Sequence, residues 1–153
     1  MATRSKLVLD KFLPYRLSMA SNLVSDTVAS AYQRAFGIGI PEWRLVAVIA
    51  EASAVSQFEI CRSTRMDKVT VSRAAITLAD RGFVMRTPNP NDQRSHLLTL
   101  TKEGRRLYNR IAPRALEIEQ QIFGAFSAAE MRAFVAMLAR IDAAALAVEP
   151  QDA

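Results

Sequence analysis

The chain has 153 residues, of which 50% are hydrophobic and 23% are charged. This composition excludes a disordered polypeptide and favours one folded domain. No uncharged apolar stretch approaches the roughly 20 residues of a membrane-spanning helix, and the N-terminal apolar stretch is too short for a secretory signal. One cysteine and one histidine cannot form an internal disulfide or an ordinary structural zinc site. We therefore expect a cytoplasmic protein without a membrane segment, metal or cofactor.

The net charge of +5 is concentrated in the middle of the chain. Residues 56–110 contain eleven lysines and arginines against five acidic residues, whereas the remaining residues contain nine against ten. Such a concentration of positive charge indicates a polyanionic partner, with nucleic acid ahead of an anionic membrane.

The first half of the chain predicts four helices. Apolar residues recur at helical spacing from Pro14 to Phe36, and Gly37 and Gly39 follow as residues that accept a left-handed C-cap. A second helix is predicted from Pro41. The capping box of Ser56 and Glu59 opens a short third helix that ends near Ser63. Asp67 then caps a fourth helix over residues 68–81, which ends on Gly82.

The second half predicts a hairpin followed by two helices. Two short strands, residues 83–87 and 94–100, flank a turn-rich stretch that we expect to form a long hairpin tip. Thr101 caps a fifth helix, and Pro113 should kink it. A second capping box at residues 127–130 opens a sixth helix that reaches about Val148.

Short helices followed directly by a two-stranded hairpin are typical of a winged helix-turn-helix. The predicted fold class is therefore mainly α with a small β-hairpin wing. In the fourth helix, a spacing of about 100° per residue places Val71, Ala74, Ala75 and Leu78 on one packed side. Lys68, Val69, Ser72, Arg73, Ile76 and Thr77 point away from that side.

The outward side of the fourth helix carries residue types that suit DNA. Ser72 and Arg73 lie within its first turn and a half, where a recognition helix presents donors to base edges, and arginine can contact guanine in a bidentate manner. Thr64, Lys68 and Thr70 surround the start of this helix, where hydroxyl, ammonium and backbone N–H groups can bind phosphates.

The wing adds a second candidate contact. Asp92 lies two residues before Arg94, and we expect the acid to orient the base so that the extended arginine enters a minor groove. Arg86 on the facing strand adds a phosphate contact. An alternative for the Asp92–Arg94 pair is a turn-stabilising ion pair, and the two roles are compatible.

The motifs Asp67-Lys68-Val69-Thr70-Val71-Ser72-Arg73, Leu78-Ala79-Asp80-Arg81-Gly82-Phe83-Val84, Asp92-Gln93-Arg94 and Leu98-Thr99-Leu100-Thr101-Lys102-Glu103-Gly104 resemble those of MarR-type transcriptional regulators. The resemblance covers roughly residues 14–146. It implies one MarR-like domain over residues 1–153, with the winged helix-turn-helix at about 41–101 and dimerisation helices at about 10–36 and 102–148.

The resemblance also implies a function. A protein of this kind is expected to be a homodimer that binds a palindromic operator in double-stranded DNA, not an enzyme. We expect a repressor that is released by a small aromatic or acidic effector, such as an aromatic acid or its CoA thioester. Ser72, Arg73 and Arg94 carry over as DNA contacts, and Val71, Leu78, Leu98 and Leu100 carry over as core.

An effector pocket is expected between the first, second and fifth helices. Arg16 is the candidate partner for an effector carboxylate or phosphate, while Asn22 and Trp43 would add a hydrogen bond and an aromatic wall. The alternative for Arg16 is an ion pair with an acidic residue across the dimer.

Two other classes of function stay open at this point. Cys61 as nucleophile with His96 as base would make a small cysteine-dependent enzyme, but no third orienting group is evident in the sequence. A winged-helix module that binds another protein is the second alternative, and the basic middle of the chain argues against it.

Overall fold

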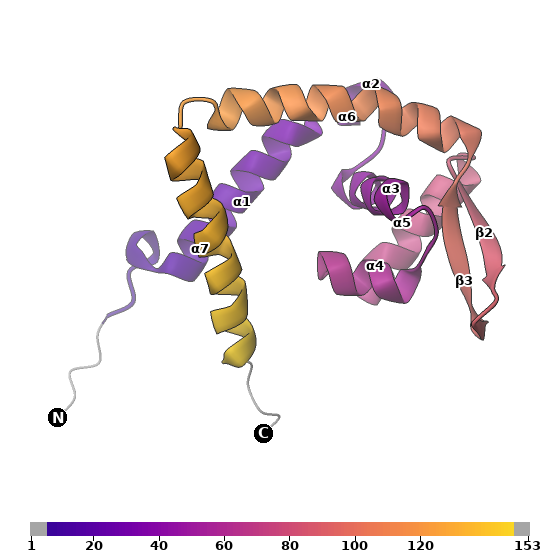
Figure 1. The fold of residues 1–153 in the computed structure, drawn as a ribbon, viewed down its shortest axis with the longest axis horizontal. Coiled ribbons are helices and arrows are strands. Elements are labelled where there is room, and N and C mark those ends of the chain that lie inside the picture. Colours follow the sequence, from indigo (N-terminus) through magenta and orange to yellow (C-terminus); the bar gives the residue numbers. More distant parts are fainter. Residues whose placement is uncertain (1–5, 149–153) are drawn as a thin grey trace. The chain divides into compact units, whose positions relative to one another are not determined.

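The computed structural model describes residues 6–148. The helices are α1 (Leu13–Ala29), α2 (Gln33–Phe36), α3 (Ile40–Ala52), α4 (Gln57–Thr64), α5 (Lys68–Asp80), α6 (Lys102–Phe123) and α7 (Ala128–Ala147), with a 3-10 turn, η1 (Leu9–Lys11), before α1. The strands are β1 (Val55–Ser56), β2 (Val84–Asn89) and β3 (Asp92–Leu100). Figure 1 shows the bundle of α3, α4 and α5 with the β2–β3 hairpin. The predicted fold class is confirmed.

The contacts divide the chain into two units, with the boundary between Ile118 and Glu119, inside α6. The predicted single domain therefore extends over two contact units, and its residues 1–5 and 149–153 lie outside the described part. Within residues 6–148, no single helix is long and apolar enough to cross a membrane, although α6 and α7 meet that test together as a bent pair, by length and composition only.

The first unit contains the hydrophobic core. Its largest fully buried side chains come from the segment between α1 and α2 and from α3, α4, α5, β3 and α6, and they include Tyr32, Leu45, Ile49, Ile60, Leu78, Leu98 and Ile111. All four residues predicted for the packed side of the fourth helix, Val71, Ala74, Ala75 and Leu78, are buried. This core holds α5 against α3 and α4, so the opposite side of α5 faces outward.

The helix starts follow the predicted caps. The Ser56 hydroxyl accepts from the Glu59 N–H (3.2 Å), and the Glu59 carboxylate accepts from the Ser56 N–H (2.9 Å). Ser127 and Glu130 form the same reciprocal pair at the start of α7. The Thr101 hydroxyl accepts from the Gly104 N–H (3.0 Å) at the start of α6. Each pair satisfies backbone donors that the first helical turn leaves unpaired.

The first predicted helix, 14–36, is instead two helices separated at Ser30–Tyr32. Tyr32 is almost completely buried, and its ring stacks on Trp43 of α3 at 5.6 Å between centroids. The helix is thus interrupted at a buried aromatic residue whose partner is distant in the sequence, which local periodicity cannot reveal. Gly37 takes the left-handed conformation as expected (φ 63°). Gly39 is extended and serves as the N-cap of α3, where its N–H donates to Glu42 (3.1 Å).

The sheet has three antiparallel strands in the order β1-β3-β2. The two-residue strand β1 was not predicted; Val55 pairs with Leu98 and Ser56 with Leu97. The hairpin tip is shorter than expected, because β2 reaches Asn89, which pairs with Asp92 after a register shift next to Pro88. The long tip predicted from residues 88–92 is therefore wrong. Side-chain hydrogen bonds within the turn replace the open loop.

Helix α6 continues through Pro113. Its first turn contacts the start of the wing so closely that a Cβ at Gly104 would lie 2.0 Å from the Phe83 carbonyl oxygen. The Thr101 N–H donates to that same carbonyl (3.1 Å), and the Thr101 hydroxyl donates to the Gly82 carbonyl (2.6 Å). A glycine at position 104 thus allows α6 to begin directly against the root of the wing.

Candidate nucleic-acid interface

Helix α5 follows α4 after a tight turn at Arg65–Asp67. Arg65 closes α4 in the left-handed conformation (φ 56°), and its N–H donates to the Cys61 carbonyl (2.9 Å). Asp67 then caps α5: its carboxylate accepts from the Thr70 N–H (2.8 Å) and from the Thr70 hydroxyl (2.9 Å). These bonds, the backbone one first, lower the pKa of Asp67, because they favour its ionised form.

The outward side of α5 is as predicted. Lys68, Val69, Arg73, Ile76 and Thr77 are exposed, and Ser72 is half-buried. Val69 and Ile76 are apolar and yet 58% and 48% exposed, so this side combines charged groups with methyl groups. Such a surface can donate hydrogen bonds to base edges and contact thymine methyls.

Two candidate phosphate contacts have other partners. The Thr64 hydroxyl donates to the Ile60 carbonyl (2.6 Å) and accepts from the Met66 N–H (3.2 Å). The Thr70 hydroxyl donates to Asp67, so its proton is not available to a phosphate. In this structure both threonines stabilise the turn between α4 and α5. Lys68 and Arg73, in contrast, are exposed cations on the outward side.

The wing brings Arg86 of β2 and Arg94 of β3 to exposed positions. Asp92 does act on Arg94, but through the main chain: its carboxylate accepts from the Arg94 N–H (3.0 Å). The side-chain amide of Asn89 forms two further hydrogen bonds at the tip. Its N–H group donates to the Ser95 hydroxyl (3.0 Å), and its oxygen accepts from the Asn91 N–H (3.0 Å). The backbone at Arg94 is therefore fixed by the turn, while its guanidinium extends from an exposed position.

The three candidate effector residues come from two helices, α1 and α3. Arg16 and Asn22 lie on exposed positions of α1, and a rise of 1.5 Å per residue puts Arg16 about 20 Å along the helix from its end at Ala29. Trp43 instead stacks between Tyr32 (5.6 Å) and Tyr108 (5.9 Å). Burial, as the largest influence, raises the pKa of Tyr32, so its phenol stays neutral.

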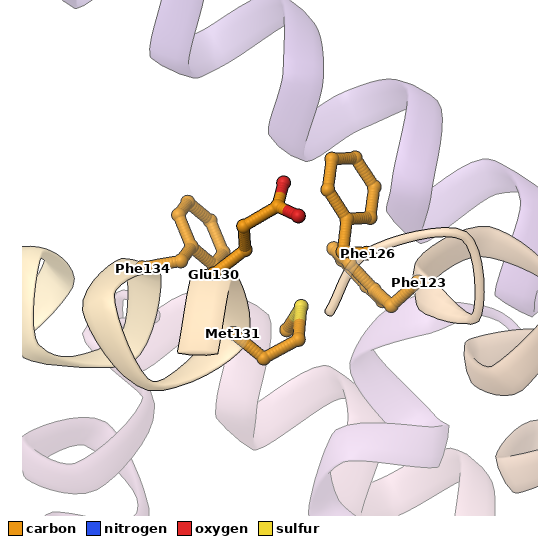
Figure 2. Close-up of a pocket in the computed structure, with 5 residues that line it drawn as sticks. All are labelled: Phe123, Phe126, Glu130, Met131 and Phe134. Atoms are coloured by element: carbon orange, nitrogen blue, oxygen red, sulfur yellow. The ribbon is translucent and has the colours of Figure 1, made fainter. Parts of the chain in front are cut away.

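A cavity of about 320 Å³ lies in the second unit, where α6 turns into α7. Phe123, Phe126, Glu130, Met131 and Phe134 line it, and Figure 2 shows the carboxylate of Glu130 between the rings of Phe126 and Phe134. Phe123 lies 6.3 Å from each of the other two rings. None of the predicted effector residues lines this cavity. The only charged side chain among these five is a carboxylate, which disfavours an acidic ligand.

The geometry gives little support to a metal site or to the cysteine-dependent enzyme alternative. Within residues 6–148, no group of three histidine, cysteine, aspartate or glutamate side chains could hold a metal ion. Cys61 is half-buried in α4, whereas His96 is exposed in the wing, opposite Pro88. The candidate nucleophile and base of the enzyme alternative therefore lie on separate elements, α4 and β3.

Known proteins share this arrangement. The model of the MarR family matches residues 36–95, the segment from the end of α2 to the wing. A MarR/EmrR family transcriptional regulator from Acinetobacter sp. ADP1 superposes with a TM-score of 0.83 at 27% identity, covering 91% of this chain and 98% of that one. The segment from α2 to the wing therefore resembles that of MarR-family regulators.

Two further proteins are similar to this chain, one in sequence and one in fold. The homoprotocatechuate degradative operon repressor of Escherichia coli is 29% identical over 97 residues, which are 63% of this chain and 66% of the repressor, slightly less than two thirds of its length. The MarR family regulator Sco3205 of Streptomyces coelicolor, solved in complex with DNA, shares the fold with a TM-score of 0.78 at 23% identity, covering all of this chain and 96% of that one. These proteins are transcriptional regulators, not enzymes.

Sequence reasoning missed Arg81, whose guanidinium bonds to carbonyl groups of α2 and the following turn. It also missed Arg62, which with Glu59 and Ser63 lines an open hollow on α4. Arg81 lies inside a motif that was recognised, but its partners are 44 and 45 residues away. No local signal in the sequence identifies such a pair.

Proposed function

We propose that this protein is a homodimeric transcriptional repressor of the MarR type that binds a palindromic operator in double-stranded DNA. One observation carries the proposal: α5 is buried on one side by the core and presents Lys68, Ser72 and Arg73 on the other, beside a wing that exposes Arg94. Each α5 enters a major groove and each wing reaches the flanking minor groove. Half-sites about one helical turn apart follow from two such helices.

The dimer is supported by apolar surface on the outer helices. Helix α7 has no buried residue, although it carries Phe134, Val135, Leu138 and Ile141. On α1, Leu13, Leu17 and Leu23 are exposed as well. Apolar surface of this extent is uncommon on a monomer and is typical of an interface. We propose that a second copy of the chain covers it.

The DNA contacts are tested by alanine substitution. Arg94→Ala should weaken binding to DNA from the region that flanks the coding sequence of this protein. Arg73→Ala should weaken binding and also relax sequence preference, because each good base contact contributes about 1–3 kcal/mol of discrimination. Fluorescence anisotropy measures both, and a thermal melt reports folding. Arg114→Ala, which removes an equally charged side chain that pairs with Glu117 on α6, is the matched control.

The outcomes of this experiment separate the candidate roles. Unchanged affinity of Arg94→Ala at moderate salt would refute the wing contact. Equal losses of Arg73→Ala on operator and random DNA would reduce Arg73 to a phosphate contact. Binding without steep salt dependence would contradict a DNA-binding function and favour the protein-interaction alternative.

We further propose that an aromatic acid or its CoA thioester releases the repressor. The similarity to a repressor of a homoprotocatechuate degradative operon supports this ligand class, since homoprotocatechuate is itself an aromatic acid. A ligand that binds the DNA-free conformation better shifts the population away from DNA. Adding homoprotocatechuate or phenylacetyl-CoA to the protein–DNA complex tests the two forms. Failure of both to lower the anisotropy would contradict the effector class.

The effector residues are tested by the same release assay. Trp43→Leu should weaken release if the ring stack with Tyr32 and Tyr108 contacts the ligand. Arg16→Gln and Asn22→Ala should weaken it if the pocket includes α1 of the partner subunit, because Arg16 is distant along α1 from the Trp43 region of its own chain. Normal release by all three variants would refute this set.

A further inference from the structure

Arg81 joins the C-terminal end of α5 to the end of α2. Its guanidinium donates to the carbonyl oxygens of Phe36 (2.7 Å) and Gly37 (3.0 Å). These carbonyls lie where α2 ends and the chain turns through the left-handed Gly37. One side chain therefore links the proposed recognition helix to the segment that continues from α1.

Two further contacts stabilise the junction between the ends of α5 and α2. The Arg110 guanidinium of α6 lies 5.0 Å from the centre of the Phe36 ring. The Arg81 guanidinium also lies 5.1 Å from the Phe83 ring, at the root of the wing. A planar guanidinium can bridge two carbonyls and lie over a ring at the same time, which a lysine cannot do. Segments of α2, α5, α6 and the wing thus meet at Arg81 and Phe36.

The buried side of α5 is separate from this junction. Val71, Ala74, Ala75 and Leu78 are buried in the core, whereas Arg81 itself is exposed. Loss of its two hydrogen bonds should leave α5 packed on α3. The same loss removes a direct connection between the end of α5 and the α1–α2 segment.

We propose that Arg81 is a positioning residue for DNA recognition, which fixes α5 relative to the α1–α2 segment. The inference rests on the proposed dimer, in which α1 contributes to the contact between subunits. Two recognition helices can match two half-sites only if their separation is well defined. Arg81 thus acts through the placement of α5 and does not itself contact DNA.

Pulsed electron–electron double resonance tests the placement without DNA. Thr77→Cys on a Cys61→Ala background puts one spin label on the exposed side of each α5, so the labels of a dimer report the separation of the two helices. The parent should give one narrow distance population. Arg81→Gln should broaden it about twofold, and Arg81→Lys should recover part of the narrow width, since lysine keeps the charge but loses the two-pronged geometry.

A matched control separates positioning from charge and stability. Arg106→Gln makes the same charge change at an exposed arginine that pairs with Glu103, and it should keep the parent's width. Spectra of samples equilibrated well below each melting temperature exclude global unfolding as the cause. A purely structural role would lower the melting temperature of Arg81→Gln without broadening the distances. That result, or equal widths in Arg81→Gln and the parent, would overturn the inference.

DNA duplexes selected from a random pool provide the second readout. Insertion or removal of one base pair between half-sites changes their separation by about 3.4 Å and rotates one about the axis. The parent should discriminate against both changes, and Arg81→Gln should lose most of that discrimination, about fivefold or more for a contact network of this kind. Equal losses at every spacing together with a smaller salt slope would make Arg81 a phosphate contact and overturn the inference.

Failure of the proposed function has a different signature. A parent protein that gives a dipolar signal but binds no selected duplex would contradict DNA binding, while the distance widths still decide the role of Arg81. A parent without any dipolar signal would refute the dimer, and the inference with it.

Discussion

The winged segment, residues 38–111, and helix α7 differ in whether their apolar residues are buried. Between Ile38 and Ile111, apolar side chains from three helices, the sheet and the start of α6 are buried within the chain itself. In α7 apolar residues are more frequent, sixteen of twenty, yet none of the residues of this helix is buried. The winged segment has its own core, whereas the apolar side chains of α7 are not buried. The two regions should therefore respond differently to mutation and to protein concentration.

The largest effect is expected from the core of the winged segment. Leu78→Ala removes a fully buried side chain of α5 and should lower the free energy of unfolding by about 3 kcal/mol. Urea denaturation at several protein concentrations measures this loss. A loss below about 1 kcal/mol would mean that the side of α5 assigned to the core is not tightly packed.

The opposite behaviour is expected for α7. Leu138→Asp places a charge on its apolar side and should weaken dimerisation about a hundredfold, because an unpaired charge buried at an interface costs about 3 kcal/mol or more. Sedimentation equilibrium measures the dissociation constant. Ala136→Asp is the control, since it lies about 200° around the helix from Leu138. Equal dimerisation of both variants would show that this side of α7 is not the contact.

The two reciprocal caps allow the same chemistry to be compared in both regions. Ser56→Ala and Ser127→Ala each remove one hydroxyl that accepts a backbone N–H, at an expected loss of about 1 kcal/mol. We expect Ser56→Ala to speed hydrogen exchange throughout the winged segment, and Ser127→Ala to speed it only in the first turn of α7. Global acceleration by Ser127→Ala would mean that α7 unfolds together with the core.

The smallest effect concerns the pH dependence of the cap of α5. The pKa of Asp67 is lowered in the folded chain, so the unfolded chain takes up the proton first as the pH falls. The contribution of the ionised Asp67 carboxylate to the free energy of unfolding is complete above the ordinary carboxyl pKa of about 3.9. It is lost as the pH falls through the lowered pKa of the folded chain. Asp67→Asn keeps a capping oxygen without the charge. The stability difference between wild type and this variant should shrink below about pH 4, and a constant difference would contradict the role of the charge.

Much of the fold can be predicted from local signals in the sequence. The caps at Ser56, Asp67, Thr101 and Ser127 are set by hydrogen bonds within three residues, and all four are present in the structure. The buried side of α5 follows from helical spacing alone. These features depend on neighbours along the chain, so one sequence is enough to identify them.

Features that depend on distant residues could not be predicted in the same way. The helix break lies beside Tyr32, whose ring stacks on Trp43, and β1 is defined by the pairing of Val55 with Leu98. Arg81 contacts carbonyl groups more than forty residues away. In the candidate site, residue types alone identified Arg73 and Arg94 as exposed cations, but they could not reveal that the hydroxyls of Thr64 and Thr70 already have partners.

The hydrogen-bonded tip of the wing has a consequence for association kinetics. Asn89, Asp92 and Ser95 fix the main chain around Arg94 before any partner arrives. A loop that is already ordered loses little conformational entropy when it docks. Under the proposed function, binding of the wing to a DNA groove therefore requires no prior folding of the loop, and the association rate depends on diffusion and on long-range attraction by the basic surface.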